Sequence, residues 1–147
     1  MISLNLPSFE YQLKKEDGKV LIFDSIRKKY LVLTPEEWVR QHFIHYLINE
    51  RKYPRSLIRL EGGLSYNTLS KRSDIVVFNR EGKPWMVVEC KAHDQPINDN
   101  TLRQASIYNA KLQAKYLAVT NGLVHYYFET DWLAGKTSVL QTIPVFE

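Results

Sequence analysis

Two carboxylates and a lysine stand at the ends of neighbouring apolar segments. Asp74 immediately precedes the apolar run 75–78, and Glu89 and Lys91 end the apolar run that begins at residue 85. Charged groups at the edge of an apolar β core cost desolvation energy, and a fold accepts that cost most readily where they hold a metal ion or do chemistry. If the two runs pair as antiparallel strands with residue numbers adding to 163, Asp74 lies opposite Glu89, with β-carbons about 5 Å apart.

The connection between the two runs, residues 79–83, decides this register. A loop with an even number of residues gives the pairing directly, and we favour it because it makes a single site. A three-residue loop with Gly82 in the left-handed conformation would shift the pairing by one, and a bulge would then be needed to restore the face. Glu89 and Lys91 are two apart and share a face of their strand, whereas Cys90 points to the other face.

Two carboxylates at this separation repel each other unless a cation neutralises them. Mg²⁺ takes oxygen ligands and usually borrows one or two protein carboxylates. Asp74 and Glu89 match that demand, the backbone carbonyl of Cys90 would lie near the same ion, and we expect that Mn²⁺ can substitute. Lys91 could then position or deprotonate a water molecule, or stabilise negative charge that develops in the reaction.

The rest of the chain predicts an α/β fold. Thr34 as N-cap, Pro35 at the first helical position and Glu37 completing a capping box start a helix that we expect to reach residue 50. A second helix is expected at 98–114, from the helical spacing of its apolar residues. Strands are expected at 20–23, 30–33, 56–61, 72–78, 85–91, 116–119, 124–128 and 139–145. Strands 72–78 and 85–91 are apolar on both faces, which indicates a central mixed sheet flanked by helices.

Bulk composition is that of one globular domain. The 147 residues are 44% hydrophobic and 24% charged, with a net charge of +4. We expect a single domain with an N-terminal hairpin at 19–33, a core at 34–130 and a C-terminal extension at 131–147. No apolar run approaches 18 residues, and residues 1–8 show no signal peptide, so no membrane partner is expected. One cysteine suits a reducing cytoplasm, and no phosphate-binding loop of a nucleotide-driven motor is encoded.

This ordered set of motifs resembles the PD-(D/E)XK nuclease superfamily, whose core is αβββαβ, and in particular the N-terminal domain of type I restriction enzyme R subunits. Asp74, Glu89 and Lys91 match the signature, with Ser73 in place of the proline. The segment 104–108 (Gln-Ala-Ser-Ile-Tyr) is similar to the Gln-x-x-x-Tyr motif of RecB-like nucleases. The helix start at 34–41 and the Thr-Asn-Gly at 120–122 resemble the type I subgroup.

The resemblance implies a restriction-endonuclease-like fold and a Mg²⁺-dependent DNA nuclease, more an endonuclease than an exonuclease, related to restriction-modification. It also implies that Gln104 and Tyr108 face the site and that a first-helix glutamate lies near the metal. We assign that glutamate to Glu36, with Glu37 as the alternative. The expected partners are DNA and a second copy of the chain in a homodimer. Because no motor is encoded here and we favour a stand-alone relative, we also expect a helicase or translocase or another restriction subunit as a partner.

Other interpretations stay open at this point. The same fold also serves as a catalytically inactive nucleic-acid-binding or subunit-interaction module, and RNA is a third possible substrate. Glu36 could be a solvated first-turn acid, which the helix dipole favours. His42 and His45 are three apart on a helix, and we expect surface histidines rather than metal ligands. A basic group that could neutralise a nucleic-acid backbone lies at Arg51, Lys52, Arg55, Arg59, Lys71 and Arg72.

Overall fold

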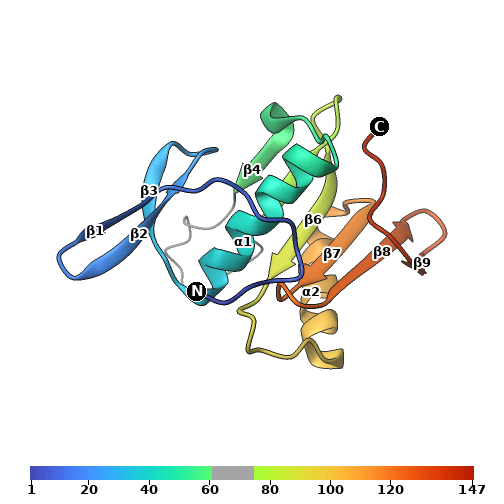
Figure 1. Ribbon diagram of the computed structural model, residues 1–147. Coiled ribbons are helices and arrows are strands. Elements are labelled where there is room, and N and C mark those ends of the chain that lie inside the picture. Colours follow the sequence, from blue (N-terminus) through green and yellow to red (C-terminus); the bar gives the residue numbers. More distant parts are fainter. Residues whose placement is uncertain (61–74) are drawn as a thin grey trace.

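The structure is a computed structural model, and it describes residues 1–60 and 75–147. The described residues form two sheets and two α-helices (Figure 1). A three-stranded N-terminal sheet contains β1 (Leu13–Glu16), β2 (Lys19–Asp24) and β3 (Lys29–Val32). A six-stranded sheet contains β4 (Ile58–Leu60), β5 (Ile75–Phe78), β6 (Pro84–Cys90), β7 (Tyr116–Thr120), β8 (His125–Asp131) and β9 (Lys136–Leu140), in that order. Helix α1 (Pro35–His45) continues as a π-helical turn, Tyr46–Glu50. A short 3₁₀ turn, Arg55–Leu57, precedes β4, and helix α2 (Asp99–Leu112) lies between β6 and β7.

The element order α1-β4-β5-β6-α2-β7 confirms the expected αβββαβ core and its mixed sheet. Strands β6 and β7 are parallel, and α2 makes the crossover between them. The other neighbouring strands of the sheet pair antiparallel. None of the helices in the described ranges is long and apolar enough to cross a membrane.

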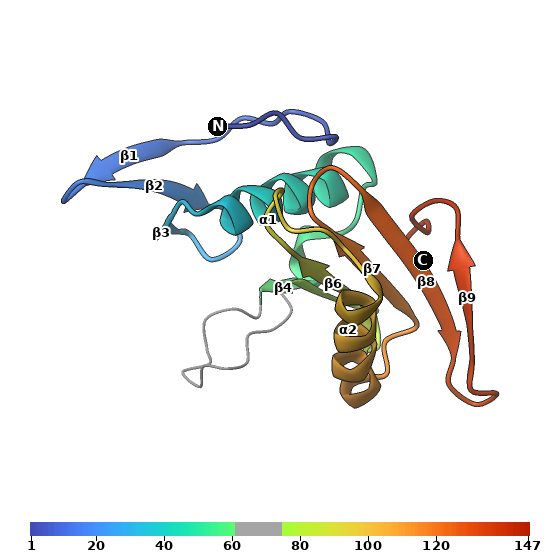
Figure 2. The same cartoon turned by 90° about the horizontal axis from the view of Figure 1, so that it is seen from below.

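Both faces of the central strands are covered, as their sequences predicted. Helix α1 lies across one face and α2 across the other (Figure 2). Residues of β5 and β6 alternate accordingly: Val77 and Val88 pack on the α1 side, and Val76 and Val87 on the α2 side. Because burial on both faces leaves no tolerance for a one-residue slip, the register of these strands is strongly specified.

The hairpin between β5 and β6 corrects one expectation. The Asn79 N–H donates to the Lys83 carbonyl, so the loop has three residues, with Gly82 at φ +84. The even loop that we favoured is therefore wrong. A bulge between Val77 and Phe78 compensates for the odd loop, and Ile75 pairs with Val88, so the residue numbers again add to 163.

Two helix starts follow from local side-chain chemistry. The Thr34 hydroxyl accepts from the Glu37 N–H at 3.0 Å, which confirms the N-cap of α1. In the predicted capping box the Glu37 side chain would also bind the Thr34 N–H. Instead, the Glu37 carboxylate binds Arg40 and Gln41. Asn98 and Thr101 form a reciprocal capping box at the start of α2.

The edges of the fold differ most from the expected element bounds. The predicted N-terminal hairpin is present as β2 and β3, but β1 adds a third strand, because Leu13 pairs with Ile22. The C-terminal edge strand β9 ends at Leu140, earlier than the expected 139–145. Exposed edge strands carry a weak hydrophobic signal, which is why sequence patterns place them poorly.

The two helix histidines are not surface residues, contrary to our expectation. His42 is buried, and its Nδ1–H donates to the Trp38 carbonyl at 2.9 Å. The N-terminal segment covers it, since the Phe9 ring lies 4.7 Å from the His42 ring and stacks on His45 at 4.4 Å. Sequence spacing could not show this, because the covering residue is more than thirty positions away.

These buried histidines predict that acid weakens the fold. Burial lowers the pKa of His42, His45 and His125, and the nearby Arg55 cation lowers that of His45 further. Below pH about 6.5 the unfolded chain binds protons that the folded chain does not, so the free energy of unfolding should fall as pH drops from about 7.5 to 5.5. Denaturant titrations across this range measure the slope. An unchanged or rising stability would contradict the prediction, and the slope should shrink in His42→Phe.

Candidate active site

Glu89 and Lys91 come together at the carboxyl end of β6. The Lys91 Nζ lies 3.5 Å from Glu89 Oε2, with side chains 34% and 14% exposed. The Lys91 N–H donates to the Thr120 carbonyl at 2.8 Å, so the pair stands where both parallel strands end. Ligands of open α/β sheets bind beyond the carboxyl ends of parallel strands. The predicted convergence of these two side chains is therefore a feature of the structure.

Cys90 lies between them and points the other way. It is fully buried in the cluster on the α1 side, together with Val88 and Ala118. The strand alternation thus keeps the thiol in the core, as expected, so only its backbone oxygen could serve a metal.

Asp74 lies outside the described residues, so its contacts with Glu89 stay a prediction. The structure does describe the antiparallel pairing of β5 and β6, in which Ile75 pairs with Val88 and Val76 with Val87. Asp74 precedes Ile75 in the sequence, and Glu89 follows Val88. The register on which the paired-carboxylate hypothesis depends is thus the observed one.

Helix α2 covers the face of the sheet to which Glu89 belongs. Tyr108 is half-buried and packs on the cluster that includes Val76 and Val87, whereas Gln104 is exposed one turn earlier. The structure therefore brings Tyr108 onto the predicted face. The roles assigned to Gln104 and Tyr108 stay predictions.

The two first-turn glutamates of α1 have different surroundings. Glu36 is exposed. Glu37 is 8% exposed, and its carboxylate forms a two-point ion pair with the Arg40 guanidinium and accepts from Gln41 Nε2 at 2.7 Å. Because the Glu37 carboxylate is already neutralised by Arg40, Glu36 remains our choice for a glutamate that approaches the site.

A buried polar network that the sequence analysis missed joins α1 to the N-terminal sheet. Gln41 also donates to Asp24 Oδ2 at 3.2 Å, and Asp24, fully buried, accepts from the Ile26 and Arg27 N–H groups. The spacing of Glu37, Arg40 and Gln41 at i, i+3 and i+4 was the available signal for the helical half. Asp24 comes from another element, and no local pattern indicates it.

The loop after β7 holds the segment that follows Lys91. Asn121 donates from Nδ2 to the Gln95 carbonyl at 2.9 Å, while its Oδ1 accepts from the Leu123 and Val124 N–H groups. The Thr120 hydroxyl accepts from the Gly122 N–H and bonds the His125 ring at 2.7 Å. The Thr-Asn-Gly segment is thus a structural clamp at the site end of the sheet.

Gly122 in this loop predicts a large effect of a single methyl group. Its φ is +88, and a β-carbon there would lie 2.9 Å from a Leu4 methyl and 3.1 Å from Val39. Gly122→Ala should lower the free energy of unfolding by about 2–4 kcal/mol, from backbone strain and overpacking together. Gly135→Ala is the matched control, since Gly135 has φ +70 but no atom within 4 Å, and it should cost about 1 kcal/mol. Equal losses in chemical denaturation would contradict this account.

The described part of the basic group flanks β4. Arg59 is exposed and its guanidinium binds the Ser56 and Ile58 carbonyls, and Arg55 binds Ser25. Lys71 and Arg72 lie outside the described residues. Lys52, Arg55 and Arg59 are exposed, and a role of the basic group in nucleic-acid binding stays a prediction.

The donor set fits a hard cation in part. Glu89 supplies a carboxylate and Cys90 a backbone oxygen, which are ligand types that Mg²⁺ accepts. Among residues 1–60 and 75–147, no three His, Cys, Asp or Glu side chains are grouped to hold a metal. Such a site would therefore need Asp74 together with water or substrate oxygens, which is the way Mg²⁺ is commonly held.

Fold and site together define an αβββαβ domain with a carboxylate–lysine pair at the end of its parallel strands. The model of the family described as type I restriction enzyme R protein N terminus (HSDR_N) matches residues 35–144. The chain belongs to this family. This confirms the resemblance to the R-subunit N-terminal domain and its link to restriction-modification.

Comparisons with individual proteins are sparse. No curated protein matches the chain. Among solved structures, it is similar to a fragment structure described as an HsdR subunit of a type I restriction enzyme from Vibrio vulnificus YJ016. The two are 28% identical over 60% of this chain and 16% of that chain, with a TM-score of 0.38. The present chain thus spans a small part of that protein.

Proposed function

We propose that this protein is a Mg²⁺-dependent DNA nuclease of a restriction-modification system and a member of the PD-(D/E)XK superfamily. The observation that carries the proposal is the convergence of Glu89 and Lys91 at the carboxyl end of β6. The described part of the β5–β6 ladder, with Ile75 opposite Val88, has the register that the paired-carboxylate hypothesis requires. Membership of the R-subunit family supports the link to DNA restriction. Endonucleolytic cutting is the form that we expect.

Asp74, Glu89 and the Cys90 carbonyl are the groups that would hold the metal. When bound, Mg²⁺ supplies Lewis-acid activation of water and neutralises phosphate charge. Only 14% of the Glu89 side chain is exposed, so its carboxylate is largely removed from bulk water. Charge interactions are stronger in this less polar environment than in water. The register observed at Ile75 and Val88 is what makes a shared role for Asp74 and Glu89 geometrically reasonable.

Lys91 acts on the scissile phosphate or on the attacking water in this proposal. Its ammonium is held near Glu89 yet is one-third exposed, so it remains accessible to a substrate. A positive group fixed at this position stabilises negative charge in the transition state. We assign Gln104 and Tyr108 to orienting Lys91 or a phosphate, and Glu36 to the role of the first-helix glutamate near the metal.

The whole enzyme would work with other components. We propose that it acts on DNA together with a helicase or translocase or another restriction subunit, in the cytoplasm, and that a homodimer serves double-strand cutting. The sequence holds one cysteine, Cys90, which is buried and cannot form a disulfide within the chain, and this suits a reducing compartment.

Cleavage assays test the proposal directly. Purified protein is incubated with supercoiled, linear and single-stranded DNA and with RNA, in Mg²⁺, in Mn²⁺ and in EDTA. We expect nicking or linearisation of DNA in either metal and none in EDTA. Binding of DNA without cleavage in any metal would instead support the alternative function, a catalytically inactive nucleic-acid-binding or subunit-interaction module.

A further inference from the structure

The N-terminal sheet has one face turned to α1 and one face turned away. On β2, Ile22 and Asp24 are fully buried, and Asp24 accepts from Gln41 of α1. Leu21 and Phe23, which alternate with them, are only partly buried. The face of Leu21 and Phe23 is therefore the outer face of this sheet.

This outer face carries aromatic and aliphatic side chains beside lysines. Phe23 pairs with Tyr30 across β2 and β3, and their rings meet edge to face with centroids 5.2 Å apart. Val32, opposite Leu21, is 48% exposed. The Lys14 Nζ lies 4.3 Å above the Tyr30 ring, in cation–π contact.

The surrounding charge is mostly positive. Residues 13–32 contain six Lys and Arg against three Asp and Glu. On the outer face itself, strand alternation places Lys14 and Lys19, with Glu16 between them. One of the three acids, Asp24, is buried against Arg27 and does not face solvent. The other two are Glu16, which lies 3.9 Å from Lys14, and Asp17 in the adjacent turn. A surface-exposed pair such as Lys14–Glu16 is worth little and can be exchanged for a phosphate.

The N-terminal sheet lies on the α1 side of the six-stranded sheet, whereas Glu89 belongs to the α2 side (Figure 2). Strand β3 ends two residues before α1 begins, and β6 runs toward that end of α1 (Figure 1). The contact that a Gly122 β-carbon would make with Val39 also places the first half of α1 over the loop at the carboxyl end of β7. A polymer bound at Glu89 and Lys91 would pass around the carboxyl end of β6 to reach the N-terminal sheet.

We infer that the outer face of the N-terminal sheet, formed by Lys14, Leu21, Phe23, Tyr30 and Val32, binds single-stranded DNA. Aromatic rings stack on unpaired bases and lysines neutralise the backbone, which is how sequence-tolerant single-strand binding works. A nucleobase would stack on Tyr30 while Lys14 turns from the ring to a phosphate. The lysine excess disfavours an apolar protein partner, because the centres of protein interfaces are depleted in lysine. The choice of DNA rests on the proposed function, but binding itself needs no cleavage.

Fluorescence anisotropy of a labelled oligothymidylate in EDTA tests this. The wild-type chain should bind, and Tyr30→Ala should weaken binding roughly five- to a hundredfold, as loss of one stacked base does. Tyr30→Phe should keep most of the affinity. Lys14→Gln, at an exposed side chain that the fold does not need, should reduce the slope of log K against log salt by about 0.7.

Tyr126→Ala is the matched control, since Tyr126 is 40% exposed on β8 of the other sheet. Equal affinity of the Tyr30→Ala and Tyr126→Ala proteins, together with an unchanged salt slope in Lys14→Gln, would overturn the inference. So would absence of oligothymidylate binding by the folded wild-type chain. Binding that responds to Tyr30 in a protein that never cuts DNA would sink the proposed nuclease and leave this inference standing.

Discussion

Lys91→Ala should abolish metal-dependent DNA cleavage, with a loss of at least about a hundredfold in rate, which is the effect of removing one fixed charge-stabilising group from an active site. The Lys91 Nζ is 3.5 Å from Glu89 and one-third exposed, so it is anchored at the site and open to substrate. DNA binding should change by only a few-fold, because we expect several basic side chains to share the neutralisation of the backbone. Initial cleavage rates and binding constants measured on the same preparations check both parts.

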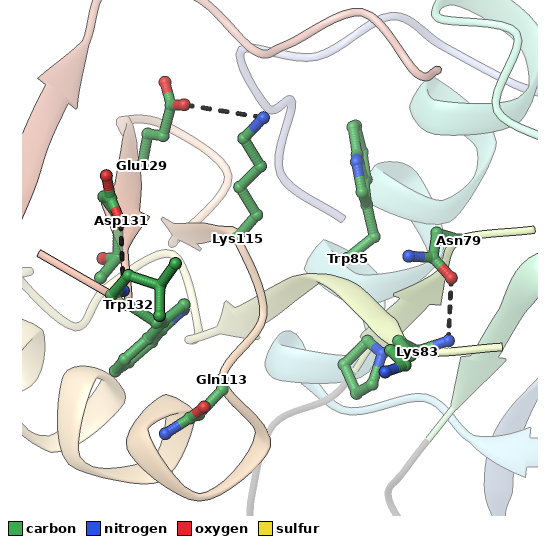
Figure 3. Close-up of a pocket in the computed structure, with 11 residues that line it drawn as sticks. Asn79, Lys83, Trp85, Gln113, Lys115, Glu129, Asp131 and Trp132 are labelled. Atoms are coloured by element: carbon green, nitrogen blue, oxygen red, sulfur yellow. Dashed lines mark hydrogen bonds and ion pairs between the residues drawn. The ribbon is translucent and has the colours of Figure 1, made fainter. Parts of the chain in front are cut away.

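The control for Lys91→Ala is a lysine in a similar ion pair far from the site. Lys115 lies 3.8 Å from Glu129, and its side chain is 49% exposed. It lines an open pocket of about 530 Å³ together with Trp85 and Trp132, beside the amino end of β6 (Figure 3). Lys115→Ala should cut like wild type. Equal cleavage by the Lys91→Ala protein, or equal loss in both variants, would remove Lys91 from the mechanism.

Arg40→Ala should lower the free energy of unfolding by about 3–5 kcal/mol, the second large effect that the structure predicts. The Arg40 and Glu37 side chains are 8% and 9% exposed, and they form a two-point ion pair. Removing the guanidinium leaves the Glu37 carboxylate buried without its compensating charge. Gln41, which bridges Glu37 to Asp24, transmits the loss to the N-terminal sheet. Urea unfolding followed by tryptophan fluorescence measures it.

Two further variants separate charge from packing in this prediction. Arg103→Ala removes an exposed arginine from α2 and should cost less than about 0.5 kcal/mol. The double variant Arg40→Ala with Glu37→Gln should recover part of the loss, since no buried charge then remains unpaired. If the double variant were as unstable as the two single losses added together, the ion pair would not be the cause.

The strand positions of Glu89 and Lys91 could be predicted because period-two alternation is local. A sequence of apolar residues ending in Glu-Cys-Lys is enough to put the acid and the lysine on one face and the thiol on the other. The loop between β5 and β6 was harder, because an even loop and an odd loop with a bulge return the same register. The left-handed Gly82 was the local signal for the odd loop.

Contacts between segments that are distant in the sequence could not be predicted from it. Helical spacing marked His42 and His45 as neighbours but did not show that Phe9 covers them. In the same way, Asp24 is buried only because Gln41 of another element meets it. The burial of such residues can be seen only in the folded structure, since it depends on long-range packing rather than on a local sequence pattern.

Mn²⁺ binding by the wild-type, Asp74→Asn and Glu89→Gln proteins, measured by electron paramagnetic resonance of the free ion, tests the central claim most directly. The claim is that Asp74 and Glu89 share one divalent cation beside Lys91. We predict one Mn²⁺ site in the wild type and a loss of at least about tenfold in affinity in each variant, since each removes a ligand charge. Wild-type affinity in both variants, or no Mn²⁺ binding by the wild-type protein, would contradict the account.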